Sequence, residues 1–138
     1  MAKFLDARTS QNASENDISI PVTKNTETLF AQVGLDADGA AGVIRSTMTG
    51  TIALDIKKYG TKVTVTVVRG TLSTDPVVLR TVTTVHDTPF SPFVLTFSGA
   101  DFDVPFEPEI IYSVFLLVDK KGVTRTGPES FFTHLHSD

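Results

Sequence analysis

The chain contains no cysteine and no tryptophan, and it has only two methionines among its 138 residues. Without cysteine, disulfide cross-links, thiolate zinc sites and cysteine nucleophiles are all excluded. No apolar run approaches the roughly 18 residues that a transmembrane helix needs, so we expect no membrane insertion. Lysine and arginine number 12 against 16 acidic residues. A chain with this balance lacks the clustered positive charge that binds nucleic acid.

The first 27 residues are predicted to form a polar N-terminal arm, and residues 28–138 a single β-sandwich domain. Residues 1–17 hold only two large apolar side chains, Phe4 and Leu5. Because so little apolar surface offsets the entropy of ordering, we expect this stretch to be mobile in an isolated subunit. It also lacks the apolar segment of a signal peptide. The protein is therefore expected to be made as a cytosolic product, or as a chain from which the signal has been removed.

A short edge strand is predicted where the arm meets the domain. Ile18, Ile20 and Val22 alternate with polar residues, so they share one face of an extended segment. Pro21 removes one backbone donor and confines this strand to the edge of a sheet. Such a strand either closes its own sheet or adds to the exposed edge of a neighbouring copy. The sequence leaves both arrangements open.

The remainder of the chain is rich in threonine and valine, with 20 and 16 residues respectively. Side chains branched at Cβ favour pleated sheets, and helical spacing of apolar residues fails throughout. We therefore predict about eight strands in a two-sheet antiparallel sandwich, with a jelly-roll or an immunoglobulin-like topology. The main strands are expected at residues 28–35, 43–56, 63–69, 76–86, 93–97, 109–119 and 131–135.

The segment 109–119 differs from the other predicted strands because it is apolar on both faces. Ile111, Phe115 and Leu117 line the face opposite the expected core. A strand of this kind is either central or covered by something outside the domain. The turn residues AspLysLysGly at 119–122 predict a hairpin to the following strand.

No motif for catalysis stands out. Asp36 to Gly39 opens like a calcium loop, but the position that should hold a bidentate glutamate is Thr47. His134 and His136 share one side of a strand, which is a weak metal signal near a terminus. His86 is isolated, and no nucleophile elbow accompanies it. We therefore expect no enzyme activity and no cofactor.

An acidic stretch offers the strongest alternative to a purely structural role. Asp101, Asp103, Glu107 and Glu109 lie within nine residues, and strand alternation would place the two aspartates side by side. Paired carboxylates suit a hard cation such as calcium. A module that binds a glycan or a host surface through this stretch is the second hypothesis. A charged loop that protects a sheet edge from aggregation is the plainer interpretation.

The order of sequence patterns resembles the compact jelly-roll subunits of bacterial endospore surfaces, which include exosporium proteins, endospore-appendage pilins and C1q/TNF-like sandwiches. The patterns that carry the resemblance are GTIALDI at 50–56, KVTVTVVRG at 62–70, PFVLTF at 92–97, YSVFLLV at 112–118 and the terminal PhePhe at 131–132. The disulfide-linked pilins carry cysteines in their N-terminal connector, and this chain has none. A phage decoration or tail-fibre domain shows the same general pattern.

Together these features predict a structural subunit that assembles with copies of itself. Non-covalent packing and exchange of the arm are expected to join the subunits. The resemblance implies a filament or layer on an extracellular, spore or particle surface, reached without a classical signal peptide. The residues expected at the contacts between subunits are Phe4, Leu5, Ile18, Ile20 and Val22 of the arm, and Ile111, Phe115 and Leu117 of the receiving face.

Overall fold

The structure, a computed structural model, describes residues 2–86 and 93–138. All regular structure in these two ranges is β-strand, and no described element is a helix that could cross a bilayer. The nine strands are β1 (Lys3–Ala13), β2 (Ile20–Val22), β3 (Thr28–Asp36), β4 (Ile44–Ile56), β5 (Thr61–Arg69), β6 (Val77–Val85), β7 (Phe93–Phe102), β8 (Glu109–Val118) and β9 (Val123–Ser137).

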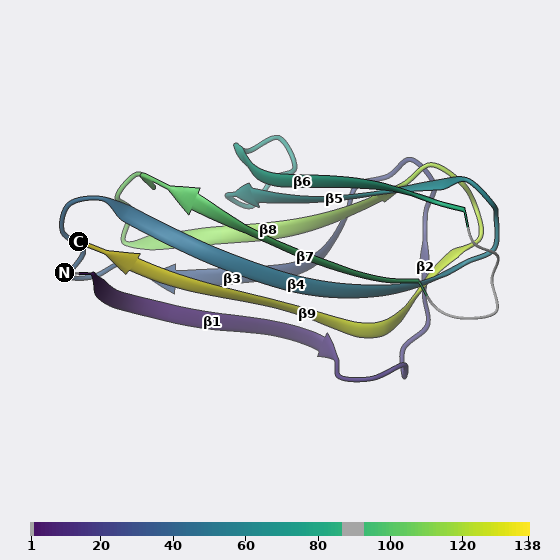
Figure 1. Ribbon diagram of the computed structural model, residues 1–138, viewed down its shortest axis with the longest axis horizontal. Coiled ribbons are helices and arrows are strands. Elements are labelled where there is room, and N and C mark those ends of the chain that lie inside the picture. The colour runs from purple at the N-terminus through teal and green to yellow at the C-terminus, as the bar shows by residue number, and fades with distance from the viewer. Residues whose placement is uncertain (1, 87–92) are drawn as a thin grey trace.

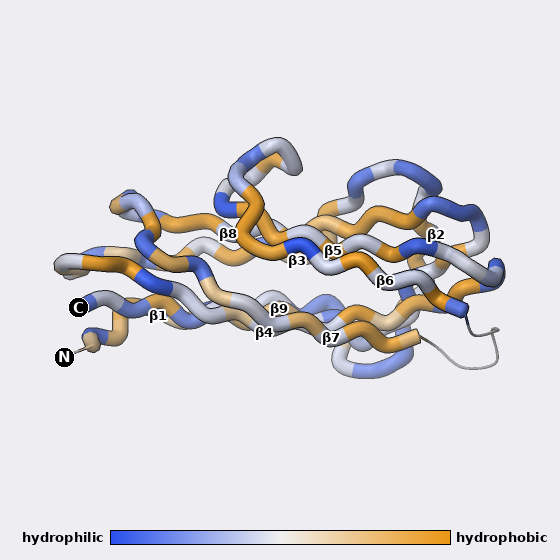
Figure 2. Tube along the Cα trace, turned by 45° about the horizontal axis from the view of Figure 1, so that its top comes forward, coloured by the Kyte–Doolittle hydropathy of each residue, from blue (hydrophilic) through white to orange (hydrophobic). Residues whose placement is uncertain are grey.

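The strands form two antiparallel sheets that lie face to face, and Figure 2 shows them as two layers. Sheet A contains β1, β9, β4 and β7 in that order, and the short strand β2 also pairs with β9. Sheet B contains β3, β8, β5 and β6. The two ends of the chain lie together at one end of the sandwich (Figure 1). The sandwich predicted from the sequence is confirmed.

The pairing of the strands is nested, as in a long hairpin folded back on itself. Strand β5 pairs with β6, β4 with β7, β3 with β8, and β1 with β9. Successive pairs fall alternately in sheet B and sheet A. This arrangement is a jelly roll, so the structure decides between the two topologies that the sequence left open.

The core fills the space between the sheets with the inward rows that alternation predicted. Val63, Val65 and Val67 of β5 are fully buried, and Phe131 of β9 lies opposite them in the same core cluster. One position has no side chain: Gly50 of β4 lies directly beneath the ring of Phe97. The Phe97 ring also stacks on Phe131 with centroids 6.2 Å apart. The absence of a Cβ at residue 50 thus makes room for an aromatic stack.

The N-terminal segment differs from the prediction. The sequence predicts a mobile stretch over residues 1–17, but residues 3–13 form β1, an edge strand of sheet A. Backbone pairing with β9 orders this strand. Because backbone hydrogen bonds do not depend on apolar side chains, the sequence shows no hydrophobic pattern that would have predicted it. The division into an arm and a domain at residue 27 stays a prediction.

The predicted hairpin at 119–122 is also wrong. The turn is present, and Gly122 has the left-handed φ of +85° that the turn chemistry requires. However, β8 lies in sheet B and β9 in sheet A, so the turn carries the chain from one layer to the other. The strand predicted at 131–135 is part of one strand that begins at Val123.

Candidate self-assembly surface

Strand β1 holds two of the residues predicted at subunit contacts. Phe4 points outward and is 60% exposed, whereas Leu5 is half-buried and packs against the core. Leu5 falls in a bulge, because the register with β9 shifts between Phe4 and Asp6. The bulge turns Leu5 toward the interior, so Phe4 alone of this pair offers apolar surface to a partner.

Polar contacts join β1 to sheet B across the open margin of the sandwich. Each runs between a β1 side chain and the backbone of β3 or of the turn after it. The Asp36 N–H donates to Asp6 Oδ2 at 2.8 Å, Lys3 Nζ donates to the Gly39 carbonyl at 2.8 Å, and Asn12 Nδ2 donates to the Phe30 carbonyl at 2.6 Å. These polar contacts, with the packing of Leu5 against the core, fix the strand against the second layer.

Asp6 is the best-bonded of these side chains. Its carboxylate accepts hydrogen bonds from the backbone N–H groups of Asp36 and Ala7 and from the Arg8 guanidinium. The Asp36 N–H contributes most, and together these donors lower the pKa of Asp6 below its ordinary value of 3.8 although partial burial opposes the shift. The attachment of β1 therefore depends on an ionised carboxylate.

A buried ion pair lies behind β1. The Arg125 guanidinium donates to both carboxylate oxygens of Glu129 at 2.6 and 2.5 Å, and Glu129 is fully buried. Asn12 of β1 donates a further hydrogen bond to Glu129 at 2.9 Å. A groove of about 470 Å³ follows this margin between β1 and β3. Because the charge on Glu129 is balanced within β9 itself, β1 can leave without exposing an unpaired buried charge.

The other arm residues lie on or beside β2. Ile20 and Pro21 pair with Arg125 and Thr124 of β9. Among the described strands β2 pairs only with β9, so it lies at an edge of sheet A, as Pro21 predicted. Val22 is buried in the core, Ile20 is 39% exposed and Ile18 is half-buried. In the single chain, β2 closes its own sheet, which is one of the two arrangements that the sequence allowed.

The predicted receiving face lies on the outside of sheet B, but it is partly covered by its own neighbours. Phe115 is only 8% exposed. Leu29 of β3 and Thr66 of β5 lie beside it in the register. Ile111 and Leu117 are half-buried. Phe115 therefore offers little surface to another molecule, and the apolar surface on this face is smaller than the sequence suggests.

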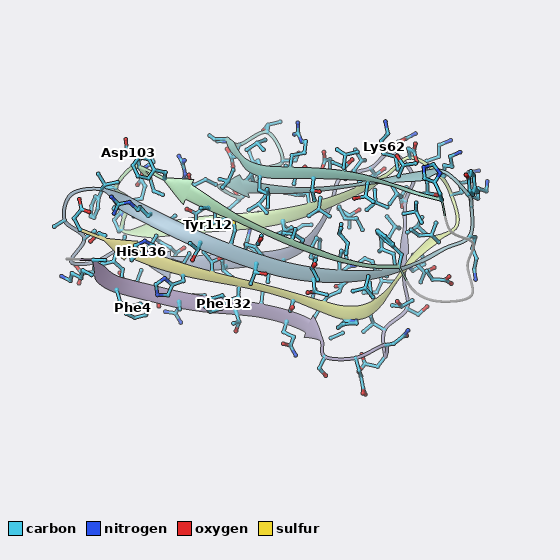
Figure 3. All side chains as sticks on the ribbon, viewed as in Figure 1. Phe4, Lys62, Asp103, Tyr112, Phe132 and His136 are labelled. Carbon is cyan, nitrogen blue, oxygen red and sulfur yellow. The ribbon has the colours of Figure 1, made fainter. Side chains whose placement is uncertain are left out.

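Exposed phenylalanines that the prediction missed lie elsewhere. Phe102 at the end of β7 is 67% exposed, Phe106 in the next loop is 63% exposed, and Phe132 of β9 is also exposed. Figure 3 shows Phe4 and Phe132 on the sheet A side of the molecule. Strand alternation could have predicted the exposure of Phe132, because adjacent residues point to opposite faces and Phe131 is buried.

The acidic stretch does not form the paired-carboxylate site that alternation suggested. Asp101 is buried, and its two oxygens accept hydrogen bonds from Arg69 at 2.9 and 3.0 Å and from Tyr112 at 2.7 Å. Asp103 lies beyond the end of β7 with a φ of +56° and is exposed. The strand ends before Asp103, so the two side chains diverge.

The Asp101 cluster ties the two sheets together. Asp101 of β7 and Ser46 of β4 belong to sheet A, and Arg69 of β5 and Tyr112 of β8 belong to sheet B. Ser46 Oγ lies 2.9 Å from the Tyr112 hydroxyl. Burial raises the pKa of Tyr112 well above its ordinary value, with the neighbouring Asp101 adding to the shift. The tyrosine hydroxyl thus stays protonated and donates to Asp101.

The remaining polar candidates stay apart. In the part of the chain that the structure describes, no three histidine, aspartate or glutamate side chains come together as metal ligands. The rings of His134 and His136 lie 5.5 Å apart on the outside of β9, beside Phe4. Glu107 and Glu109 border a hollow of about 270 Å³ between β5 and the start of β8.

Comparison with solved structures finds the same fold in viral particle proteins. The VP2 subviral particle of infectious bursal disease virus matches with a TM-score of 0.57 and 9% identity, over 96% of this chain and 32% of that chain. A structure of the Gx strain of the same virus matches with a TM-score of 0.52 and 11% identity, over 96% and 36%. The chain thus spans about a third of the proteins it matches.

At this identity the likeness concerns the fold alone. No protein-family model matches the sequence, and no curated protein matches it.

Proposed function

We propose that the protein is a structural, non-catalytic subunit that assembles with copies of itself into a particle, filament or layer. Association is non-covalent, and β1 with β2 exchanges between neighbouring copies. The finer part of the proposal is that the assembly lies outside the cell, on a spore or particle surface. The jelly-roll fold supports the coarser part, since the viral proteins of the same fold include one whose structure is a subviral particle.

The attachment of β1 is the observation that carries the exchange. The strand is held by backbone pairing with β9 and by polar contacts, and its inward positions at the margin are Asp6, Arg8 and Ser10. Exchange of an identical strand between copies recreates every one of these contacts, so its cost is limited to opening the connection. That connection, residues 23–27 between β2 and β3, is exposed throughout.

An engineered disulfide tests the exchange directly. Gln11 of β1 lies opposite Ser130 of β9, and the chain has no other cysteine to interfere. In the Gln11→Cys/Ser130→Cys variant, oxidation of the assembled protein is expected to link two chains if β1 is exchanged. A denaturing gel without reductant then shows a covalent dimer or ladder.

The two single variants are the matched controls, since neither has an intended partner cysteine. If the double variant assembles but forms disulfides only within one chain, the exchange of β1 is contradicted, whereas the proposal of assembly is not. Electron microscopy and light scattering of the unmodified protein test the broader proposal. Fibres, sheets or closed shells support it, and a monomer that persists at high concentration contradicts it.

A further inference from the structure

The outer face of sheet A is organised in four rows, each crossing β1, β9, β4 and β7 in register. All sixteen side chains are exposed or half-buried. The first two rows are Phe4, His136, Arg45 and Phe102, then Ala7, His134, Thr47 and Ala100. The next two are Thr9, Phe132, Thr49 and Ser98, then Gln11, Ser130, Thr51 and Thr96.

This face has the composition of a protein interface. No lysine, aspartate or glutamate occurs in the four rows, and Arg45 is the single arginine. Its guanidinium pairs with Asp138 at 3.0 Å and lies 5.3 Å from the centre of the Phe102 ring. Interface centres are depleted of lysine and acidic residues and enriched in aromatic residues and arginine.

The two ends of the face differ in relief. The first row carries the two most exposed aromatic side chains of the face, Phe4 and Phe102. Toward the fourth row, side chains are small, and a hollow of about 120 Å³ lies among Thr49, Thr96, Phe97 and Ser98. The protruding ring of Phe102 and this hollow both lie on β7, the ring in the first row and the hollow beside the third and fourth rows.

The shape of the face allows contact with a second sheet of the same dimensions. Four strands about 4.8 Å apart, each about seven residues long from the first row to the fourth at about 3.3 Å per residue, give a flat area of roughly 440 Å². Side-chain relief makes the accessible area larger than this. A standard stable interface buries about 800 Å² on each partner.

From these observations we propose that the outer face of sheet A packs against the same face of a second copy, turned end for end. A two-fold axis across the strands places β9 over its equivalent and β4 over its equivalent, running in opposite directions. The first row of one copy then lies over the fourth row of the other, and Phe102 of each copy enters the hollow of its partner. Large side chains thus meet small ones, and the His134, His136 and Arg45 groups of the two copies stay apart.

This inference rests on the proposed function, because it names one contact through which the subunits assemble. An interface of this kind is isologous: each copy contributes the same surface, and the pair is closed. The margin of β1 remains available for contacts to further copies.

A charge placed at the centre of the face tests the proposal. Thr49 is exposed in the third row, so Thr49→Glu puts two unpaired carboxylates into the proposed interface. Thr84→Glu on the outside of sheet B is the matched control, since Thr84 is an equally exposed strand residue. By sedimentation velocity over a concentration series, Thr49→Glu is expected to raise the dissociation constant at least about tenfold, because buried like charges repel. Thr84→Glu should change it less than about twofold.

A second pair of variants tests the ring and its hollow. Phe102→Ala is expected to weaken association at least about tenfold, as loss of an aromatic anchor that fills a hollow of the partner does. Phe106→Ala removes a comparably exposed phenylalanine from the neighbouring loop and should not weaken it. All four variants change exposed side chains, and circular dichroism melting confirms that each is folded before it is compared.

Cross-linking tests the orientation. A mixture of Ser130→Cys and His136→Cys chains, treated with a bismaleimide that spans the ~10 Å between stacked sheets, should give a mixed dimer. Each chain alone should give much less. If instead each chain cross-links only to itself, the end-for-end arrangement is wrong.

The outcomes separate this inference from the broader proposal. If the protein assembles and neither Thr49→Glu nor Phe102→Ala weakens assembly, this face is not a contact, although the structural role stands. If the unmodified protein stays monomeric at every concentration, both proposals fail. Loss of assembly in Thr49→Glu and Phe102→Ala, with Thr84→Glu and Phe106→Ala unchanged, supports the contact.

Discussion

Gly50 shows how one missing side chain organises the core at the residue scale. A Cβ at this position would meet the Cε1 and Cε2 atoms of Phe97 at 2.8 Å. The Phe97 ring has no free direction to move, because it stacks on Phe131 and contacts Phe30 edge-on with centroids 6.4 Å apart. The glycine therefore serves packing rather than backbone flexibility.

We expect Gly50→Ala to lower the free energy of unfolding by about 1–3 kcal/mol, as overpacking of a filled core does. Gly34→Ala in β3 is the control, because its added Cβ would meet only the movable end of the exposed Glu109 side chain. Urea denaturation followed by circular dichroism measures both changes. Equal midpoints for the two variants would contradict the role assigned to Gly50.

Sequence reasoning at this scale succeeded for buried rows and failed for individual polar groups. The inward positions of β5 and β8 follow from alternation, because apolar residues have no other way to avoid water on a half-buried strand. The partners of Asp101 could not be derived in this way. They come from two other strands, β5 and β8, and only the three-dimensional arrangement brings Arg69 and Tyr112 to the same carboxylate.

At the scale of the element, polar side-chain contacts hold much of β1 against the second sheet. The folded-state pKa of Asp6 is lower than its ordinary value of 3.8. Its contribution to stability is therefore fully present above about pH 4 and is lost as the pH falls through the lowered folded-state value. Acid should loosen β1 before it affects strands that are held by apolar packing.

Amide hydrogen exchange measured by NMR tests this expectation. Asp6→Asn should reduce the protection of β1 amides by about 1 kcal/mol at neutral pH, because the charged acceptor is gone. In the unmodified protein the same protection should fall as the pH is lowered below about 4, and in the variant it should change little over the same titration. Amides of β5 are the internal reference. Parallel loss of protection in β1 and β5 on acidification would show that Asp6 has no local effect.

The elements that sequence reasoning missed share a physical cause. β1 is an edge strand at an open margin, and its inward positions between Leu5 and Ala13 are polar (Asp6, Arg8 and Ser10), so no hydrophobic period marks it. The turn at 119–122 has local chemistry that predicts a reversal correctly. Turn chemistry does not specify whether the next strand joins the same sheet, and here Val123 begins a strand in the opposite layer.

At the scale of the whole molecule, the nested pairing means that each successive pair of strands, from β5–β6 outward to β1–β9, joins residues farther apart along the chain. The β5–β6 hairpin closes a short loop, whereas β1 and β9 pair residues more than a hundred positions apart, such as Ala13 with Glu129. Closing a long loop costs more entropy, and non-local pairing slows folding. We therefore expect the inner hairpin to form before the outer strands, and folding to take milliseconds to seconds.

Stopped-flow folding at a concentration where the chain is monomeric tests this order. Val65→Ala in β5 and Leu135→Ala in β9 both remove fully buried side chains. Val65→Ala should mainly slow folding, because its contacts form early, and Leu135→Ala should mainly speed unfolding. The reverse pattern would place the nucleus at the outer pair.

The sandwich itself was predictable from composition and strand alternation, but its jelly-roll topology was not. Alternation assigns each strand an inner and an outer face and is silent about which strands are neighbours. The long-range pairs, such as β1 with β9, are chosen by the packing of the whole core. The residues at candidate subunit contacts could not be predicted for the same reason, since the exposure of Phe102 depends on which strands lie beside it.

One consequence of the nested pairing concerns how the chain can be rewired. The outermost pair brings Lys3 opposite Ser137 at one end of the sandwich (Figure 1). A short linker from residue 138 back to residue 1 would turn β9 and β1 into an ordinary hairpin, and new ends could be opened in the exposed turn at 71–74. Such a circular permutant would keep every strand pair of the jelly roll while moving both ends of the polypeptide away from β1.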